Sequence, residues 1–365
     1  MFEIDANRVY TPPRPCIIPH KQFPKAPDSH RNRAKIMTEP TCVPHEVGRL
    51  QQEALFAPLK KEPAQVLAFV NQKGGTGKTT TAQNLAVCFG LRHDKRVLCV
   101  DLDPQGNLGQ GLVFDQINNP KTADRLLVVP KVNINEYILQ VRPNIDLIHN
   151  KFQKEQREAV DRLPLYPNLL RKQLGAALTR YDYVIVDTPA GLCRSTQIGI
   201  DAADQVVLVV SCGMYGLKGM VAVVDWMSGI YNRLARPMPS IKVVLNNYDE
   251  RRRFDREFRR EIQHIFGDDL FQTHIRTSAR IIEAAAQGMA VVERYPLCPA
   301  TEDFKWLSRE ILGLPPNGAS SAGSGWSDQE EVVVKGPWRQ DKHIINSGVA
   351  GLEVKNLYNK VTSAS

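Results

Sequence analysis

A glycine-rich turn between an apolar run and an amphipathic segment constrains this chain more than any other feature. The apolar run ends at Val70, and the segment after the turn places Ala82, Leu85 and Phe89 on one side at 100° per residue, which favours a helix. Between a strand and a helix, such a turn directs its backbone N–H groups and the helix N-terminus at phosphate oxygens. The turn reads Asn71-Gln72-Lys73-Gly74-Gly75-Thr76-Gly77-Lys78-Thr79-Thr80.

The residue types in this turn predict a site for ATP with Mg²⁺. Lys78 is placed to neutralise the β- and γ-phosphates, and the Thr79 hydroxyl is placed to hold Mg²⁺. The general phosphate-loop pattern has glycine where Gln72 stands, and here an additional lysine, Lys73, opens the turn. The residues expected to contact the phosphates are Gly74, Gly75, Thr76, Gly77, Lys78, Thr79 and Thr80.

Short apolar runs rich in β-branched residues recur through the middle of the chain. They lie at 66–70, 97–100, 145–148, 184–186, 206–210 and 241–245. Helix-like stretches such as 79–91 separate them. Nearly continuous apolar strands that alternate with helices indicate a mostly parallel, twisted β-sheet with helices on both faces. We therefore predict an α/β fold of the P-loop NTPase type.

The composition divides the 365-residue chain into three regions. Residues 1–64 are rich in proline and basic, and we expect a flexible extension with a possible short helix at about 46–56. Residues 65–315 carry the alternating pattern and form the predicted ATPase domain. Residues 316–365 begin with a Gly/Ser-rich stretch and are expected to be a low-complexity tail. Residues 303–312 read as the last helix that covers the core.

Charge and cysteine usage limit the partners and the compartment. The formal net charge is +8 and the pI about 9.1, which favours polyanions, either nucleic acid or an anionic membrane surface. The seven cysteines form no C-x-x-C pair, and several lie in apolar runs. We therefore expect no zinc site, and we expect a reducing, cytoplasmic location. No stretch is apolar over the length that a bilayer requires.

Carboxylates follow two of the predicted strands. Asp101 and Asp103 come after the run 97–100, and Asp187 comes after 184–186. Ligands of parallel α/β sheets lie beyond the carboxyl ends of the strands, where acids can order a metal ion and an attacking water. An aspartate in either segment alone is more often a turn or a helix cap, so the functional interpretation depends on the glycine-rich turn.

Together these motifs resemble the ParA/MinD family of ATPases with a deviant Walker A loop, and the ParA/Soj branch most closely, over residues 65–315. The resemblance implies that Lys73 is the lysine that reaches the partner's phosphates in a nucleotide-sandwich homodimer. It implies that Asp103 positions the hydrolytic water, and that Asp187 and Asp101 belong to the metal site. Asn246 lies in a segment that resembles the one running past the nucleotide base.

Two later segments support the ParA branch. Residues 211–219 end in the Tyr-x-Leu-x-Gly pattern, and residues 275–284 resemble the Arg-x-x-Glu-Ala segment. The chain departs from the ParA pattern at Thr277, Ser278 and Ala286, which affects the details of DNA contact.

Six arginines crowd the segment 251–260. With 252–266 as a helix, Phe254, Phe258, Ile262 and Ile265 form one apolar stripe, and most of the arginines lie opposite. The segment then presents no aromatic interleaving of the kind that suits stacking on single strands. A solvated helix face with local ion pairs is the plain alternative. The family resemblance implies DNA contacts by the arginines Arg251, Arg252, Arg256 and Arg280.

The resulting expectation is a slow, partner-stimulated ATPase whose ATP-bound homodimer binds double-stranded DNA non-specifically on the nucleoid. A ParB-like centromere-binding protein is the expected partner, and a plasmid or chromosome the expected cargo. A MinD-like membrane-associated ATPase and a ParA-type ATPase for cargo other than DNA stay open as alternatives, although the polar segment 352–365 does not suit membrane binding. A nitrogenase-iron-protein-like reductase lacks a second cysteine at a matching position.

Overall fold

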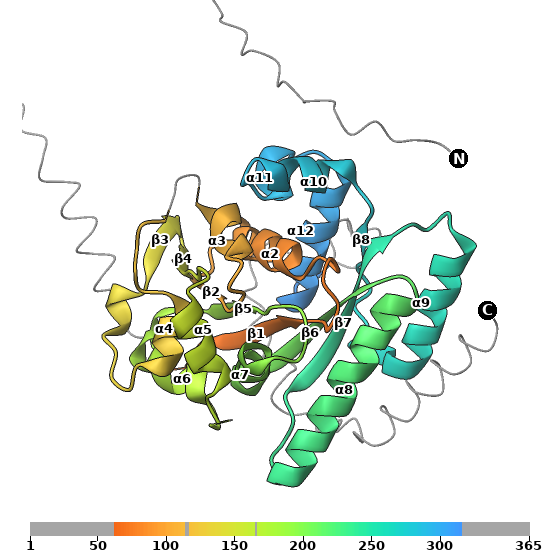
Figure 1. Ribbon diagram of the computed structural model, residues 1–365. Helices are drawn as coiled ribbons and strands as arrows, with labels where there is room; N and C mark the ends of the chain where they lie inside the picture. Colours follow the sequence, from red (N-terminus) through yellow and green to blue (C-terminus); the bar gives the residue numbers. More distant parts are fainter. Residues whose placement is uncertain (1–61, 114–116, 165, 316–365) are drawn as a thin grey trace, which may run out of the picture. The chain divides into compact units, whose positions relative to one another are not determined.

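The computed structural model describes residues 62–113, 117–164 and 166–315. The expected N-terminal extension with its short helix and the C-terminal tail lie outside these residues. Within them, eight strands form one sheet in the order β3-β4-β2-β5-β1-β6-β7-β8 (Figure 1). The strands are β1 (Gln65–Val70), β2 (Val97–Asp101), β3 (Leu139–Arg142), β4 (Ile145–Ile148), β5 (Tyr183–Asp187), β6 (Gln205–Ser211), β7 (Ser240–Tyr248) and β8 (Ile275–Arg276).

The pairing is parallel throughout the sheet except between β3 and β4. This confirms the predicted α/β class, and each of the six apolar runs corresponds to a strand. The sequence pattern did not reveal β3, which is half-buried at the sheet edge, or β8, which is only two residues long. Neither is long and apolar enough to produce a strand signal.

The strands read as continuous apolar runs because both faces of the sheet are covered. In β1, Val66, Ala68 and Val70 belong to one apolar cluster, whereas Leu67 and Phe69 belong to another on the opposite face. Side chains alternate between the faces of a strand, so a strand buried on both sides has no polar positions.

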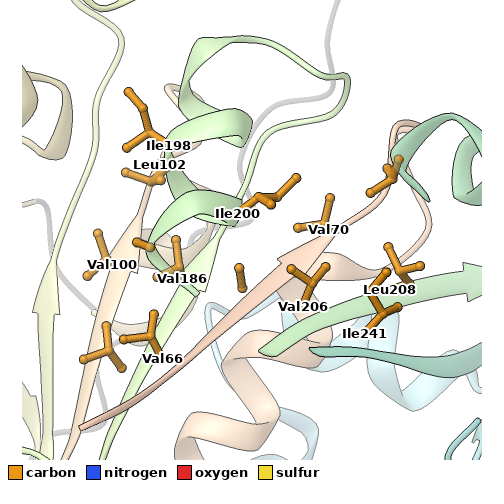
Figure 2. Close-up of a cluster of buried hydrophobic side chains, with 14 of the residues drawn as sticks. Val66, Val70, Val100, Leu102, Val186, Ile198, Ile200, Val206, Leu208 and Ile241 are labelled. Carbon is orange, nitrogen blue, oxygen red and sulfur yellow. The ribbon is translucent and has the colours of Figure 1, made fainter. Parts of the chain in front are cut away.

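The first cluster is covered by helices from the middle of the chain, and Figure 2 shows Ile200 of this cluster near the strand residues Val186 and Val70. These helices are α4 (Ala123–Val128), α5 (Lys154–Asp161), α6 (Leu169–Leu174), α7 (Arg194–Ala202), α8 (Met214–Leu234) and α9 (Arg253–Phe266). The second cluster is covered by α2 (Lys78–Arg92), α3 (Asn107–Leu112), α10 (Ala279–Ala286), α11 (Val291–Arg294) and α12 (Pro299–Ile311).

Helices α2 and α12 match the predicted helices 79–91 and 303–312, and they pack against each other. None of the helices in the described ranges is long and apolar enough to cross a membrane. Because β1, β2, β5, β6 and β7 are parallel, the segments that follow them emerge at the same edge of the sheet. The phosphate-binding loop and Asp103 belong to these segments, and Asp101 and Asp187 are the last residues of β2 and β5.

Candidate nucleotide-binding site

The glycine-rich turn forms a closed loop between β1 and α2. Gly75 and Gly77 have φ angles of 74° and 90°, a left-handed conformation that favours glycine. A Cβ atom at Gly77 would also lie 2.0 Å from the side-chain amide nitrogen of Asn246, whereas a Cβ at Gly75 would meet nothing within 4 Å. Gly77 is thus required both by its backbone conformation and by the close approach of Asn246.

Asn246 reaches this loop from β7. It is buried, and its Nδ2 donates a hydrogen bond of 2.7 Å to the Thr76 carbonyl. The sequence placed Asn246 among the nucleotide contacts near the base. In the structure its amide holds the loop backbone, and a contact with the base stays a prediction.

Further polar groups at the strand ends fix the start of the loop. The Asn71 amide donates to the Val209 carbonyl of β6 at 2.8 Å, and its Oδ1 accepts from the backbone N–H of Lys73 at 3.0 Å. Gly191 N–H donates to the Gln72 carbonyl at 2.8 Å, and the Thr188 hydroxyl donates to the Phe69 carbonyl at 2.7 Å. The sequence analysis missed Asn71 and Thr188, although a polar residue directly after an apolar strand was a usable signal.

The two lysines of the loop differ in environment. Lys78 is buried, and its Nζ donates to the Lys73 carbonyl at 3.3 Å, so the ammonium lies against the loop backbone. Burial lowers the pKa of Lys78, and the carboxylates of Asp187 and Asp103 oppose that shift. The Lys73 residue is exposed on the loop, as the sequence-based role of reaching a second molecule requires.

Asp101 and Asp187 face each other across the β2–β5 pairing and are both fully buried. Burial raises the pKa of Asp187 to about 7, against the opposing effects of the Thr79 hydrogen bond and of Lys78. Burial also raises the pKa of Asp101 well above its usual value, and Asp187 adds to this. Two buried carboxylates this close favour a proton or a cation between or beside them.

The arrangement of Asp187 and Thr79 fits Mg²⁺. The Thr79 hydroxyl donates to Asp187 Oδ2 at 2.6 Å, and Oδ1 of Asp187 is buried without a hydrogen-bond partner in the described part of the chain. A hydroxyl and an uncommitted carboxylate oxygen are the oxygen ligands that Mg²⁺ takes at phosphate sites. Thr79 and Asp187 are therefore the residues that would hold the ion.

Asp101 is engaged differently from Asp187. Its Oδ1 accepts from the Asp103 N–H at 3.0 Å, and its Oδ2 accepts from the N–H groups of Leu108 and Gly109 at 3.1 and 3.2 Å. Asp101 thus holds the segment that leads into α3. Its sequence-based role as a metal ligand stays a prediction.

Asp103 lies in this segment and completes the cluster. It is half-buried, and its Oδ1 accepts from the Gln105 N–H at 2.9 Å. Gly106, with φ of 69°, passes so close to the Asn150 carbonyl that a Cβ would lie 2.6 Å from it. Lys78 interacts electrostatically with both Asp187 and Asp103, so the structure brings these three residues together around one loop. The close approach of the Asn150 carbonyl, just after β4, to Gly106 was not predicted.

The predicted DNA-binding arginines occupy two places. Arg251, Arg252 and Arg256 lie at or just before the first turn of α9, and Arg280 lies on α10. Arg251 donates two hydrogen bonds to Asp249, and Arg280 pairs with Glu283 at 2.6 Å and lies over the Tyr295 ring.

The predicted apolar stripe of α9 is wrong at its first position, whereas Phe258, Ile262 and Ile265 do pack against the core. The buried positions are Asp255, Phe258, Ile262 and Phe266, whereas Phe254 is 47% exposed. Asp255 turns inward because its Oδ2 accepts the backbone N–H of Asp249 at 2.8 Å, and this fixes the rotation of the first turn.

Known proteins share this chain's sequence and fold. A family model described as an AAA domain matches residues 64–239. A ParA family protein of Chlamydia trachomatis is 33% identical over 261 residues, which span 69% of this chain and 99% of that protein. The chromosome-partitioning ATPase Soj of Treponema pallidum is 29% identical over 265 residues, which span 68% and 97%.

A solved ATP complex of McdA from Cyanothece superposes with a TM-score of 0.60 over 70% of this chain and 98% of that one. At 21% identity this likeness supports the fold alone. The sequence relatives, taken with the phosphate-binding loop and its carboxylates, show that the chain belongs to the ParA/MinD family of ATPases.

Proposed function

We propose that this chain is a ParA-type partitioning ATPase that positions or segregates plasmid or chromosomal DNA. In the proposed cycle, ATP closes a sandwich homodimer that binds double-stranded DNA without reading its sequence. A ParB-like partner then stimulates slow hydrolysis, which returns the protein to monomers. The observation that carries this proposal is the cluster of Lys78, Thr79, Asp103 and Asp187 around one loop in a member of this family.

Each residue of the cluster has a role in this proposal. Lys78 is already desolvated inside the loop, so its ammonium binds the β- and γ-phosphates with little competition from water. Thr79 and Asp187 hold Mg²⁺, which neutralises phosphate charge when it is bound. Asp103 orients the attacking water and accepts its proton. Lys73 extends from the loop to the phosphates bound by the second copy.

The arginines near α9 supply the proposed DNA contact. Between Asp249 and Arg260 there are six arginines and four carboxylates, so the segment has a net charge of +2. Such contacts go to the phosphate backbone, carry no sequence information and weaken as salt rises. Location on the nucleoid follows from this contact.

Duplex DNA binding by the wild type and the Lys78→Ala variant tests the proposal. Each protein is measured with ATP, with ADP and without nucleotide across a range of salt concentrations. We expect binding only for the wild type with ATP, and a steady loss of affinity as salt increases. Binding without nucleotide, or ATP-dependent binding to anionic vesicles but not to DNA, would contradict the proposal.

A further inference from the structure

An exposed aromatic ring lies within the arginine-rich segment that precedes and begins α9. Phe254 is 47% exposed, whereas Phe258, one turn later, is 6% exposed. The two rings are stacked, with centroids 6.2 Å apart and planes inclined by 26°. Phe254 therefore partly covers the edge of the core while its ring stays accessible to a ligand.

The side chains next to Phe254 in the sequence are cationic and open to solvent. The side chains of Arg251, Arg252 and Arg253 are 90%, 61% and 85% exposed. Arg256 donates to the backbone carbonyls of Glu250 and Arg251, which orients its guanidinium without neutralising it. The Phe254 ring is thus flanked in the sequence by solvent-exposed guanidinium groups.

The carboxylates near these arginines do not prevent them from binding an anion. Arg251 pairs with Asp249 and Arg253 with Glu257, but both pairs involve highly exposed guanidinium groups. Exposed ion pairs of this kind contribute little, because water and salt screen them. Phosphate groups can replace them, because guanidinium–phosphate contacts are bidentate and charge-assisted.

A ligand that matches this surface has both phosphates and a flat apolar face. Unpaired nucleotides have both, whereas the bases of an intact duplex are stacked on one another and inaccessible to the ring. We propose that the surface formed by Arg251–Arg256 binds DNA with unpaired bases, with the Phe254 ring stacked on a base and the arginines on the flanking phosphates. This inference rests on the proposed DNA-binding function and adds a preference for opened DNA.

A lipid surface is a poorer match for the same residues. Insertion of a helix into a bilayer interface requires several apolar side chains on one exposed face. In α9 the other large apolar residues, Phe258, Ile262 and Phe266, are buried in the core, and Ile265 packs against it. A single ring remains for the ligand, which suits stacking on a base better than insertion among acyl chains.

The test compares the full-length wild type, Phe254→Leu and Phe254→Trp in the presence of ATP at low salt. Leucine still covers Phe258 but cannot stack, and tryptophan can do both. The probes are a fluorescent single strand, a fully paired duplex, a duplex of the same length with a central unpaired bubble, and vesicles of phosphatidylglycerol. The control variant is Phe152→Leu, which changes another exposed phenylalanine, 58% exposed, outside this surface. Thermal unfolding of each variant confirms that it is folded.

Base–aromatic stacking contributes about 1–3 kcal/mol per base, so Phe254→Leu should weaken binding to the single strand and the bubble by roughly 5- to 150-fold. We expect Phe254→Trp and Phe152→Leu to match the wild type on these probes, and all four proteins to bind the paired duplex alike.

Two results would overturn the inference. One is equal binding of Phe254→Leu and wild type to the single strand and the bubble. The other is a loss confined to vesicles of phosphatidylglycerol, which would assign the ring to a membrane. In either case the proposed DNA-binding function survives if the wild type still binds the paired duplex with ATP and Arg251→Ala weakens that binding. If the wild type binds no DNA with ATP, the proposed function and this inference fail together.

Discussion

Gly77 and Asn246 share one crowded point where β7 meets the phosphate-binding loop. The Asn246 amide donates to the Thr76 carbonyl. The residue after Thr76 is Gly77, which has no side chain that could displace the Asn246 amide. This hydrogen bond links the phosphate-binding loop to β7 across a sequence separation of 170 residues. The shape of the loop thus depends on a residue outside the phosphate-binding motif.

We predict that Gly77→Ala abolishes ATP binding, because the added methyl would displace Asn246 and strain a residue with φ of 90°. Isothermal titration with ATP and Mg²⁺ measures the effect. Gly229→Ala is the matched control, since a Cβ there meets nothing within 4 Å and the residue lies inside α8. That variant should bind ATP normally and gain about 0.5–1 kcal/mol of stability. ATP binding by Gly77→Ala at wild-type affinity would refute the prediction.

Asp187 is a buried carboxylate whose charge is only partly compensated by Thr79 and Lys78. Its pKa is about 7 in the folded protein against 3.8 for the free side chain. A raised folded-state pKa means that ionisation opposes folding, so this group lowers stability progressively as pH rises from about 4 to 7. In the proposed function, bound Mg²⁺ would remove that penalty.

We predict that Asp187→Asn unfolds at the same or a higher temperature than the wild type at pH 8 without ligand, because the substitution removes a buried carboxylate. With Mg²⁺ and ATP the order should reverse, since the variant lacks the carboxylate that holds the ion and gains little from the ligand. Differential scanning fluorimetry with and without Mg²⁺ and ATP measures both quantities. An equal ligand-induced shift in both proteins would show that Asp187 is not needed for the metal.

At the scale of whole elements, the short strand β8 depends on helix α12. Asp303 of α12 accepts three hydrogen bonds from Arg276 of β8: from the backbone N–H at 3.0 Å, from Nε at 2.7 Å and from Nη2 at 2.6 Å. Asp303 is buried, whereas Arg276 is partly exposed. A two-residue strand at the sheet edge makes few backbone hydrogen bonds to its neighbour. The Asp303 carboxylate supplies acceptors that hold β8 in place.

We predict that Asp303→Ala lowers the free energy of unfolding by about 1–3 kcal/mol, because it leaves the donors of Arg276 without an acceptor. Urea denaturation followed by circular dichroism is the measurement. Glu302→Ala is the control on the same helix, since the Glu302 side chain is half exposed and pairs with Lys305 at the surface. Its cost should stay below about 1 kcal/mol. Similar costs for the two variants would contradict the proposed dependence of β8 on α12.

At the scale of the whole molecule, the two loop lysines should separate nucleotide binding from dimer formation. Lys78 is buried against its own loop, whereas Lys73 is exposed. A lysine that neutralises the phosphates bound by its own chain is needed for binding. A lysine that reaches a second copy is needed only for association.

We predict that with ATP the wild type elutes with twice the mass of the 41.0 kDa chain, as measured by light scattering after gel filtration. Lys73→Ala should stay monomeric but still bind ATP, and Lys78→Ala should lose both properties. A Lys73→Ala protein that dimerises as readily as the wild type would remove the basis for the sandwich dimer.

The sequence by itself determined the class of fold and the place of the nucleotide site. The apolar runs and the strand–turn–helix order at positions 66–91 are local patterns, set by side-chain periodicity and by glycine, and they require no knowledge of distant contacts. The carboxyl ends of parallel strands meet at one edge of the sheet, so Asp103 and Asp187 could also be placed near the loop from the sequence.

Only the tertiary structure decided which partner each of these groups has. Asp101 and Asp187 occupy equivalent positions after neighbouring strands, yet backbone N–H groups surround Asp101 and leave one oxygen of Asp187 uncommitted. Helical periodicity predicted the spacing of the apolar residues in α9 but not which face of the helix turns toward the core. The hydrogen bond from the Asp249 N–H to Asp255 sets that rotation and leaves Phe254 partly exposed. Contacts between residues far apart in the chain form only when the chain is folded, and local pattern does not encode them.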